Sequence, residues 1–254
     1  MEPKTGRSYV AELVGTFLLV FFICMVVSLT SREALGFTDW AVIGLVHAFV
    51  LGMLFAALAG VCGAHFNPAV TIALAAMRKI RGNDAAVYIL MQLVGATLAA
   101  LLVKATIEDE GKPVNYGATI VSKAFLGGNF NGMVLEAVGT FALMLSIVGT
   151  AVIVKNKSDL TPWIIGGTLG MAVMCIGPLT GAGLNPARAF GPLLVSHQLS
   201  DNFGQFIVTY TLGPIIGALL AVFLVNYLYP DDLQEAEAVT APREDVIAIP
   251  ADEI

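Results

Sequence analysis

The sequence Gly63-Ala64-His65-Phe66-Asn67-Pro68-Ala69-Val70 recurs in altered form as Gly181-Ala182-Gly183-Leu184-Asn185-Pro186-Ala187-Arg188. In each copy an asparagine stands where it can cap a helix, and a proline takes the first helical position, where no amide hydrogen is needed. Short apolar stretches follow at residues 69–77 and 187–195. One Asn-Pro pair is a common turn signal. Two copies in corresponding halves of the chain predict a pair of short helices with a shared role.

The composition is typical of a membrane protein. Of the 254 residues, 57% are hydrophobic and only 13% are charged, against roughly 25% charged in soluble domains. Acidic residues collect near the C-terminus, so the net charge of −6 says little about partners. The chain has no basic patch with interleaved aromatic residues, which argues against nucleic acid as a partner. The three cysteines lack the spacing of a metal or redox site.

Six segments are long and apolar enough to cross a bilayer, which takes roughly 20 residues of helix. They lie near residues 8–29, 40–60, 85–107, 132–154, 161–178 and 203–228. The two stretches that follow the asparagines are too short to cross, which predicts re-entrant half-helices. The expected fold is an all-α membrane protein with six transmembrane helices and two half-helices.

Basic residues in the short connections predict the orientation. If six helices alternate in direction, Lys4, Arg7, Arg78, Lys79, Arg81, Lys155 and Lys157 fall on one side, and Arg32, Lys112 and Lys123 on the other. Because basic residues are in excess on the cytoplasmic side, we expect cytoplasmic termini and a location in the plasma membrane. Residues 229–254 are acidic and contain three prolines, which predicts a disordered cytoplasmic tail.

The two halves of the chain also match elsewhere. Residues 12–17 (Glu-Leu-Val-Gly-Thr-Phe) recur at 136–141, and residues 94–99 recur approximately at 216–221. We therefore expect one channel domain, 1–228, made of repeat one (8–107) and repeat two (132–228). Because each repeat contains an odd number of spanning helices, the second must enter the membrane from the opposite side. The two half-helices would then meet near the midplane.

This geometry predicts a pore. Backbone polar groups cannot be left bare in hydrocarbon, so we expect carbonyl groups that face a water-filled path, those of Gly63, Ala64, His65, Gly181, Ala182 and Gly183. Each half-helix brings on the order of half a positive charge to its N-terminus. If Asn67 and Asn185 cap their helices through oxygen, their NH2 groups remain as donors toward the path. Neutral hydrogen-bonding solutes would pass, and protons and ions would not.

The paired boxes Asn67-Pro68-Ala69 and Asn185-Pro186-Ala187, Arg188 three residues after the second asparagine, and the two Glu-x-x-Gly-Thr-Phe elements carry a resemblance. Over residues 8–228 the chain resembles the aquaporin, or major intrinsic protein, family. The resemblance implies a homotetramer with one pore in each monomer, no cofactor and no metal. It also implies that Glu12 and Glu136 are buried and hydrogen-bond the pore loops.

The resemblance further places the selectivity filter of the family at His47, Val173, Ala182 and Arg188. This combination is most similar to plant tonoplast intrinsic proteins, which pass water and often ammonia or urea. Glycerol facilitators usually carry Asp after the filter arginine, where this chain has Ala189. The resemblance therefore favours water and small neutral solutes over glycerol.

Several alternatives remain at this point. The chain could be a facilitator mainly for ammonia, urea or glycerol, or an ion-coupled secondary transporter, since inverted repeats and half-helices occur there too. No catalytic residue set in a plausible context indicates an enzyme. His65 either lines the cytoplasmic vestibule or braces its loop. Lys104, near a helix end, is expected to snorkel toward the membrane surface.

Overall fold

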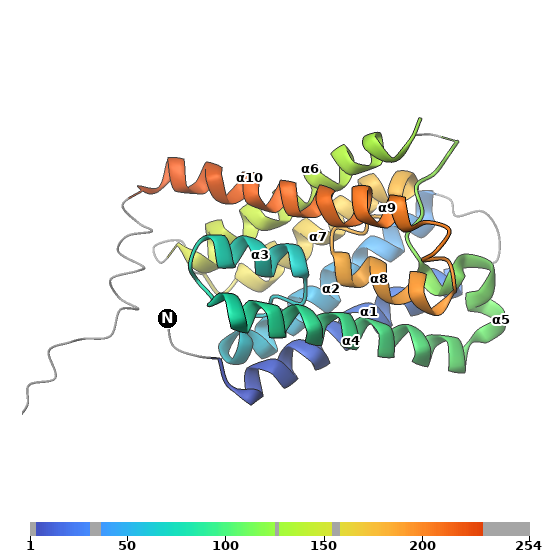
Figure 1. Ribbon diagram of the computed structural model, residues 1–254, viewed down its shortest axis with the longest axis horizontal. Coiled ribbons are helices and arrows are strands. Elements are labelled where there is room, and N and C mark those ends of the chain that lie inside the picture. Colours follow the sequence, from blue (N-terminus) through green and yellow to red (C-terminus); the bar gives the residue numbers. More distant parts are fainter. Residues whose placement is uncertain (1–3, 31–36, 125–126, 154–157, 231–254) are drawn as a thin grey trace, which may run out of the picture.

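The computed structural model describes residues 4–30, 37–124, 127–153 and 158–230, except for the side chains of residues 37 and 38. In these ranges the chain forms helices joined by turns and loops, without a strand (Figure 1). The predicted tail is described only as far as residue 230. Its remainder lies outside the described residues, as do Arg32, Lys155 and Lys157, which contributed to the predicted orientation.

Within the described ranges, six helical segments are long and apolar enough to cross a membrane. They are α1 (Gly6–Thr30), α2 (Phe37–Cys62), α4 (Gly82–Thr106), α6 (Asn129–Ile147) with the π-turn η2 (Val148–Val152), α7 (Thr161–Thr180), and α9 (Phe203–Ile207), η4 (Val208–Leu212) and α10 (Gly213–Leu228) in one run. The shorter elements are α3 (Pro68–Ala76), α5 (Glu108–Gly111), η1 (Lys112–Gly117) and α8 (Pro186–Val195). The predicted fold class is confirmed.

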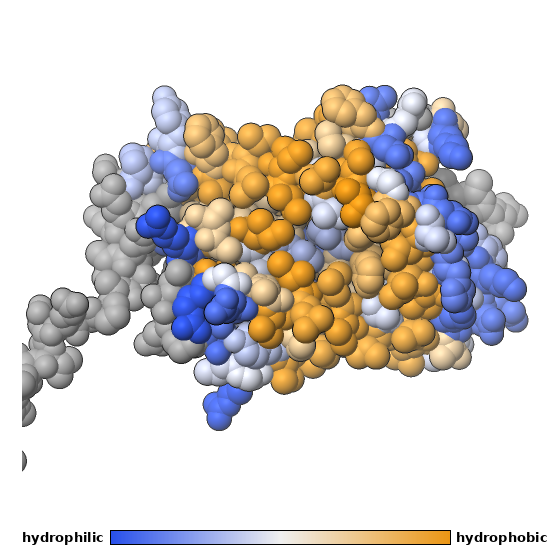
Figure 2. All heavy atoms as spheres, viewed as in Figure 1, coloured by the Kyte–Doolittle hydropathy of each residue, from blue (hydrophilic) through white to orange (hydrophobic). Residues whose placement is uncertain are grey.

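The surface matches a bilayer. Figure 2 shows apolar side chains across the middle of the visible face and hydrophilic side chains at both ends. Large apolar residues such as Phe49, Leu101 and Phe223 are exposed on the outside of the helices, where water would be an unfavourable neighbour. Lipid contact or contact with another protein accounts for these side chains.

The two halves pack in the same way. Helix α1 packs against α4 in the first half, α6 packs against α10 in the second, and α2 contacts α7 between them. The half-helices also contact the opposite half, α3 with α10 and α8 with α4. Figure 1 shows α3 and α8 toward opposite ends of the bundle. Each half-helix therefore depends on both repeats for its position.

Two equivalent glycines permit close helix contacts. A Cβ added to Gly95 would lie 2.5 Å from the carbonyl oxygen of Leu13, and one added to Gly217 would overlap the carbonyl oxygen of Ala137. Both glycines belong to the repeated segments, and Leu13 and Ala137 each follow the repeated glutamate. The repetition in sequence therefore reflects a repeated close approach of backbones, which only glycine allows.

Candidate functional site

Both half-helices begin at a capping asparagine. Asn67 Oδ1 accepts a hydrogen bond from the amide of Ala69 at 2.9 Å. Asn185 Oδ1 accepts from the amides of Ala187 at 3.0 Å and Arg188 at 3.3 Å. The asparagine backbones are extended, and the prolines that follow take the first helical position. The positive ends of α3 and α8 are thereby fixed at the centre of the bundle.

The same asparagines join the two repeats. Asn67 Nδ2 donates to the carbonyl of Leu184, and Asn185 Nδ2 donates to the carbonyl of Phe66, each at 2.8 Å. An amide NH2 group has two hydrogens, so one hydrogen of each asparagine is left for a ligand. From the sequence, both hydrogens were expected to face the path. These bonds could not be predicted, because the carbonyl partners lie in the other half of the chain.

The loops before the asparagines share an unusual backbone. At equivalent positions both loops enter the left-handed region, with φ of 88° at Gly63, 52° at Ala64, 48° at Phe66, 78° at Gly181, 46° at Ala182 and 51° at Leu184. This conformation costs a residue other than glycine roughly 1–2 kcal/mol. Surrounding contacts must therefore impose it, as is common at functional sites.

Glu12 supplies such contacts to the first loop. Its carboxylate oxygens accept hydrogen bonds from the amides of His65 at 2.9 Å and Phe66 at 2.8 Å. Gln92 Nε2 donates to the same carboxylate at 2.8 Å. Glu12 is completely buried and has no contact with water. These donors take the place of the water molecules that would hydrate an exposed carboxylate.

Glu136 does the same for the second loop. Its Oε1 accepts from the hydroxyl of Thr180 at 2.6 Å and the amide of Gly183 at 2.9 Å, and its Oε2 accepts from the amide of Leu184. Glu136 is also completely buried. Both glutamates thus turn the amide groups of a pore loop toward the protein, and this arrangement repeats across the two halves.

A narrow cavity and a wide vestibule adjoin at this point. The narrow cavity has a volume of about 20 Å³, room for about one water molecule. Its polar lining includes His47, Asn67, Asn185 and Arg188, and most of the remaining wall is apolar. The vestibule has a volume of about 970 Å³, and His65 lines both spaces.

His47 lines the narrow cavity and carries a buried hydrogen-bond acceptor. Its Nδ1 lies 2.8 Å from the carbonyl of Ile43, and since a carbonyl can only accept, Nδ1 carries the hydrogen. Nε2 is then an acceptor, and it is buried without a protein partner in the described part of the chain.

Arg188 lines the same cavity and carries a buried donor. Its Nη1 donates to the carbonyl of Gly117 at 2.7 Å, whereas its Nε is buried without a protein partner among the described residues. Buried polar groups are normally hydrogen-bonded. An unpartnered acceptor on His47 and an unpartnered donor on Arg188 therefore indicate a small solute that can both donate and accept.

Comparison with known proteins identifies this arrangement. The family model described as Major intrinsic protein matches residues 1–225. The chain belongs to the major intrinsic protein family. Over 245 residues, 90% of the chain and 99% of the relative, it is 37% identical to "Probable aquaporin AqpM" of Archaeoglobus fulgidus. Over 246 residues, 94% of the chain and 92% of the relative, it is 35% identical to "Aquaporin TIP4-4" of Zea mays.

A solved structure has the same fold as this major intrinsic protein. The aquaglyceroporin from Plasmodium falciparum superposes with a TM-score of 0.75 at 22% identity, covering 88% of this chain and 97% of that one. The family and the six spans make this chain an integral, multi-pass membrane protein and a passive channel, not an enzyme.

Two of the four expected filter residues of this major intrinsic protein line the narrow cavity, and two do not. His47 and Arg188 line the narrow cavity. Val173 and Ala182 are almost completely buried and line neither the narrow cavity nor the vestibule. Their contribution to the filter stays a prediction.

The expected pore carbonyls of this major intrinsic protein also divide. Ala64, His65 and Gly183, three of the residues with an expected pore carbonyl, line the narrow cavity. Gly63 lines the vestibule. Gly181 lines neither space. His65 fits both of its interpretations, because it lines both spaces and its amide is held by Glu12. The carbonyl groups as a path for solutes therefore remain a prediction.

The partner of the filter residue Arg188 could not be predicted from the sequence of this family member. Gly117 supplies the carbonyl for Arg188, and its φ of 82° follows two left-handed residues, Asn115 and Tyr116. An asparagine two residues before a glycine signals a turn but not its acceptor. Lys104 Nζ lies 3.4 Å from the carbonyl at the end of α8 and 5.6 Å from the ring centre of Tyr116. Snorkelling alone is therefore an incomplete account of Lys104.

Proposed function

We propose that each monomer of this protein conducts water and small neutral solutes passively through the narrow cavity, and that the cavity excludes protons and ions. The observation that carries the proposal is a space of about 20 Å³ whose wall includes His47 and Arg188, two residues that each carry an unpartnered polar atom. Passing solutes would bind to a few fixed groups, while the apolar remainder of the wall offers no further hydrogen bonds to slow them.

The two asparagines account for proton exclusion. Asn67 and Asn185 each keep one amide hydrogen after the bond across the repeats. A water between them would accept from both and turn its own hydrogens away, so it could not accept from the next water. This interrupts a proton wire. The positive ends of α3 and α8 and the charge of Arg188 would repel cations.

The filter supports small solutes in addition to water. Arg188 Nε can donate and His47 Nε2 can accept, which suits water, ammonia and urea alike. Small side chains at Val173 and Ala182 would leave the filter wider than larger residues would. Several relatives are named aquaporins, including plant members, which supports water as a solute. The likeness to an aquaglyceroporin concerns the fold alone.

For the orientation, the assembly and the domain limits, we propose what the sequence predicts. Lys4, Arg7, Lys79 and Arg81 belong to the basic side of the chain, and Lys4 and Lys79 line the vestibule. The vestibule would therefore open to the cytoplasm, together with both termini. We further propose a homotetramer in the plasma membrane and a single channel domain at 1–228.

Stopped-flow measurements on proteoliposomes test this function. Gradients of an impermeant osmolyte, ammonia, urea and glycerol would be applied in turn, with empty liposomes as the control. We expect fast water exchange, measurable ammonia and urea flux, and no proton flux in a pH-dye assay. Water permeability equal to that of empty liposomes would contradict the proposal. Ionophore-sensitive accumulation against a gradient would instead support an ion-coupled transporter.

A further inference from the structure

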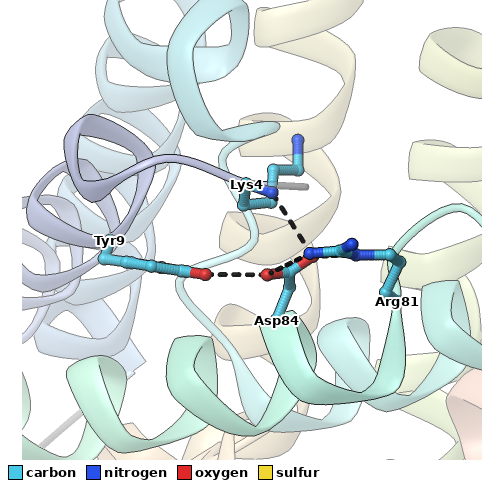
Figure 3. Close-up of polar contacts among 4 residues, drawn as sticks. All are labelled: Lys4, Tyr9, Arg81 and Asp84. Atoms are coloured by element: carbon cyan, nitrogen blue, oxygen red, sulfur yellow. Dashed lines mark hydrogen bonds and ion pairs between the residues drawn. The ribbon is translucent and has the colours of Figure 1, made fainter. Parts of the chain in front are cut away.

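Asp84 gathers donors from separate segments at the vestibule end of the molecule (Figure 3). Its Oδ1 accepts from the hydroxyl of Tyr9 at 2.7 Å, and its Oδ2 accepts from the backbone amide of Lys4 at 3.3 Å. Arg81 Nε donates to Oδ2 at 2.8 Å. Asp84 is only 3% exposed, so this is a buried carboxylate whose charge depends on these donors.

These contacts hold the start of α1 against the ends of two other helices. We call residues 4–9, the first turn of α1 and the two residues before it, the N-terminal strap. Asp84 binds both Lys4 and Tyr9 of the strap to the first turn of α4. Ser8 Oγ donates to the carbonyl of Val61 at 2.9 Å, which binds the strap to the end of α2. The pore loop begins directly after that end.

Packed aromatic rings connect the strap to the pore. The ring of Tyr9 meets the ring of Tyr88 edge to face, with centres 5.9 Å apart, and Tyr88 meets His65 in the same way at 5.1 Å. Tyr88 is completely buried, and its hydroxyl donates to the carbonyl of Cys62 at 2.8 Å. Asp84 is therefore connected to His65 through the rings of Tyr9 and Tyr88, which pack against each other.

The second repeat has a tyrosine equivalent to Tyr88 but no equivalent of the strap. Tyr210 donates to the carbonyl of Thr180, the last residue of α7, just as Tyr88 donates to the carbonyl of the last residue of α2. Counted from these tyrosines and from the repeated glutamates, Asp84 corresponds to Phe206 and Tyr9 to Met133. The second pore loop is thus held by Tyr210 and Glu136 without an equivalent of the strap. The polar strap is an addition found on the vestibule side.

We propose that Asp84 and Tyr88 are positioning residues that hold the ring of His65 beside the path where the vestibule meets the narrow cavity. The inference rests on the proposed water channel. When Asp84 releases Tyr9, Tyr88 loses the ring that packs against it. The ring of His65 then keeps its contact with Thr71 Oγ1 at 3.1 Å but loses the support of Tyr88, and its imidazole can turn into the path. Water permeation then falls, although no residue of the filter has changed.

Asp84→Asn tests the proposal, because it keeps the shape of the side chain and removes its charge. The readout is osmotic water permeability per reconstituted channel, with folding checked by thermal unfolding. We expect a roughly two- to fivefold loss, which lies in the lower part of the range of coupling found between residues in contact. The matched control is Asp201→Asn, the same change at an exposed position in the corresponding loop of the second repeat, which should leave permeability unchanged.

The His65→Ala background decides whether Asp84 acts through His65. In that background Asp84→Asn should cause no further loss, and an equal fractional loss would overturn the proposal. A folded Asp84→Asn channel with wild-type permeability would overturn it as well. If Asp84→Asn fails to fold, Tyr9→Phe keeps both rings, removes one hydrogen bond and should show a smaller, His65-dependent loss. A wild-type protein without water permeability would instead contradict the proposed function.

Discussion

Replacing Glu136 by glutamine tests the brace of the second pore loop. The change keeps the size of the side chain but replaces one carboxylate oxygen by an NH2 group. Glu136 faces only donors, those of Thr180, Gly183 and Leu184. One of these donors must therefore lose its acceptor, whichever way the amide is turned.

The cost follows from the geometry. With the remaining oxygen at the Oε1 position, glutamine keeps the bonds from Thr180 and Gly183 and turns its NH2 group toward the amide of Leu184. A buried donor left without a partner costs about 1–3 kcal/mol. The two retained bonds also weaken, since hydrogen bonds to charged acceptors are roughly twice as strong as neutral ones. We expect the Glu136→Gln protein to be destabilised by about 1–3 kcal/mol.

Function should change together with stability. The carbonyl oxygen of Leu184 also accepts a hydrogen bond from Asn67 Nδ2. A displacement of Leu184 would therefore disturb the centre of the pore. We expect lower water permeability in proteoliposomes and earlier thermal unfolding in detergent. Glu108→Gln, the same change on an exposed side chain, is the control. If Glu136→Gln unfolds and conducts like the control, the carboxylate does not brace the loop.

Three further predictions concern the filter and the helix packing. Arg188→Val removes the fixed charge and the free Nε donor, so we expect increased passage of ions or larger solutes in flux assays; unchanged exclusion would place the constriction elsewhere. His47→Phe adds bulk and removes the Nε2 acceptor, so ammonia and urea permeability should fall relative to water; an unaltered ratio would mean that His47 does not face the path. Gly217→Ala should destabilise the protein by about 1–3 kcal/mol through overlap with a helix backbone. Gly167→Ala is the control, because an added Cβ there would have no neighbouring atom within 4 Å, and it should stabilise the protein by about 0.5–1 kcal/mol. Equal unfolding temperatures for Gly217→Ala and Gly167→Ala would argue against the close helix contact at Gly217.

The spans and half-helices could be predicted because their signals are local. An apolar run of sufficient length specifies a spanning helix, and the Asn-Pro pair marks where α3 and α8 begin. The observed limits of the spanning segments agree with the predicted ones to within three residues. The repeated glutamates and glycines also stood out, because the same packing recurs in both halves.

The partners of the pore residues could not be predicted from local signals. The carbonyl that binds Asn67 lies 117 residues away, at Leu184. The carbonyl that binds Arg188 belongs to Gly117, in a loop without apolar periodicity. The strap likewise joins Tyr9 to Asp84 across 75 positions. Each contact depends on which helix ends meet, and a single sequence does not contain that information.

The exchanged hydrogen bonds between Asn67, Leu184, Asn185 and Phe66 also bear on how the protein is made. They join positions 117 and 119 residues apart, and chains are synthesised from the N-terminus. While the ribosome is still producing the second repeat, Asn67 has no carbonyl to bind and the first half-helix has no counterpart. The centre of the pore therefore takes shape only after the second half-helix has been inserted. A chain interrupted between the repeats would lack this site entirely.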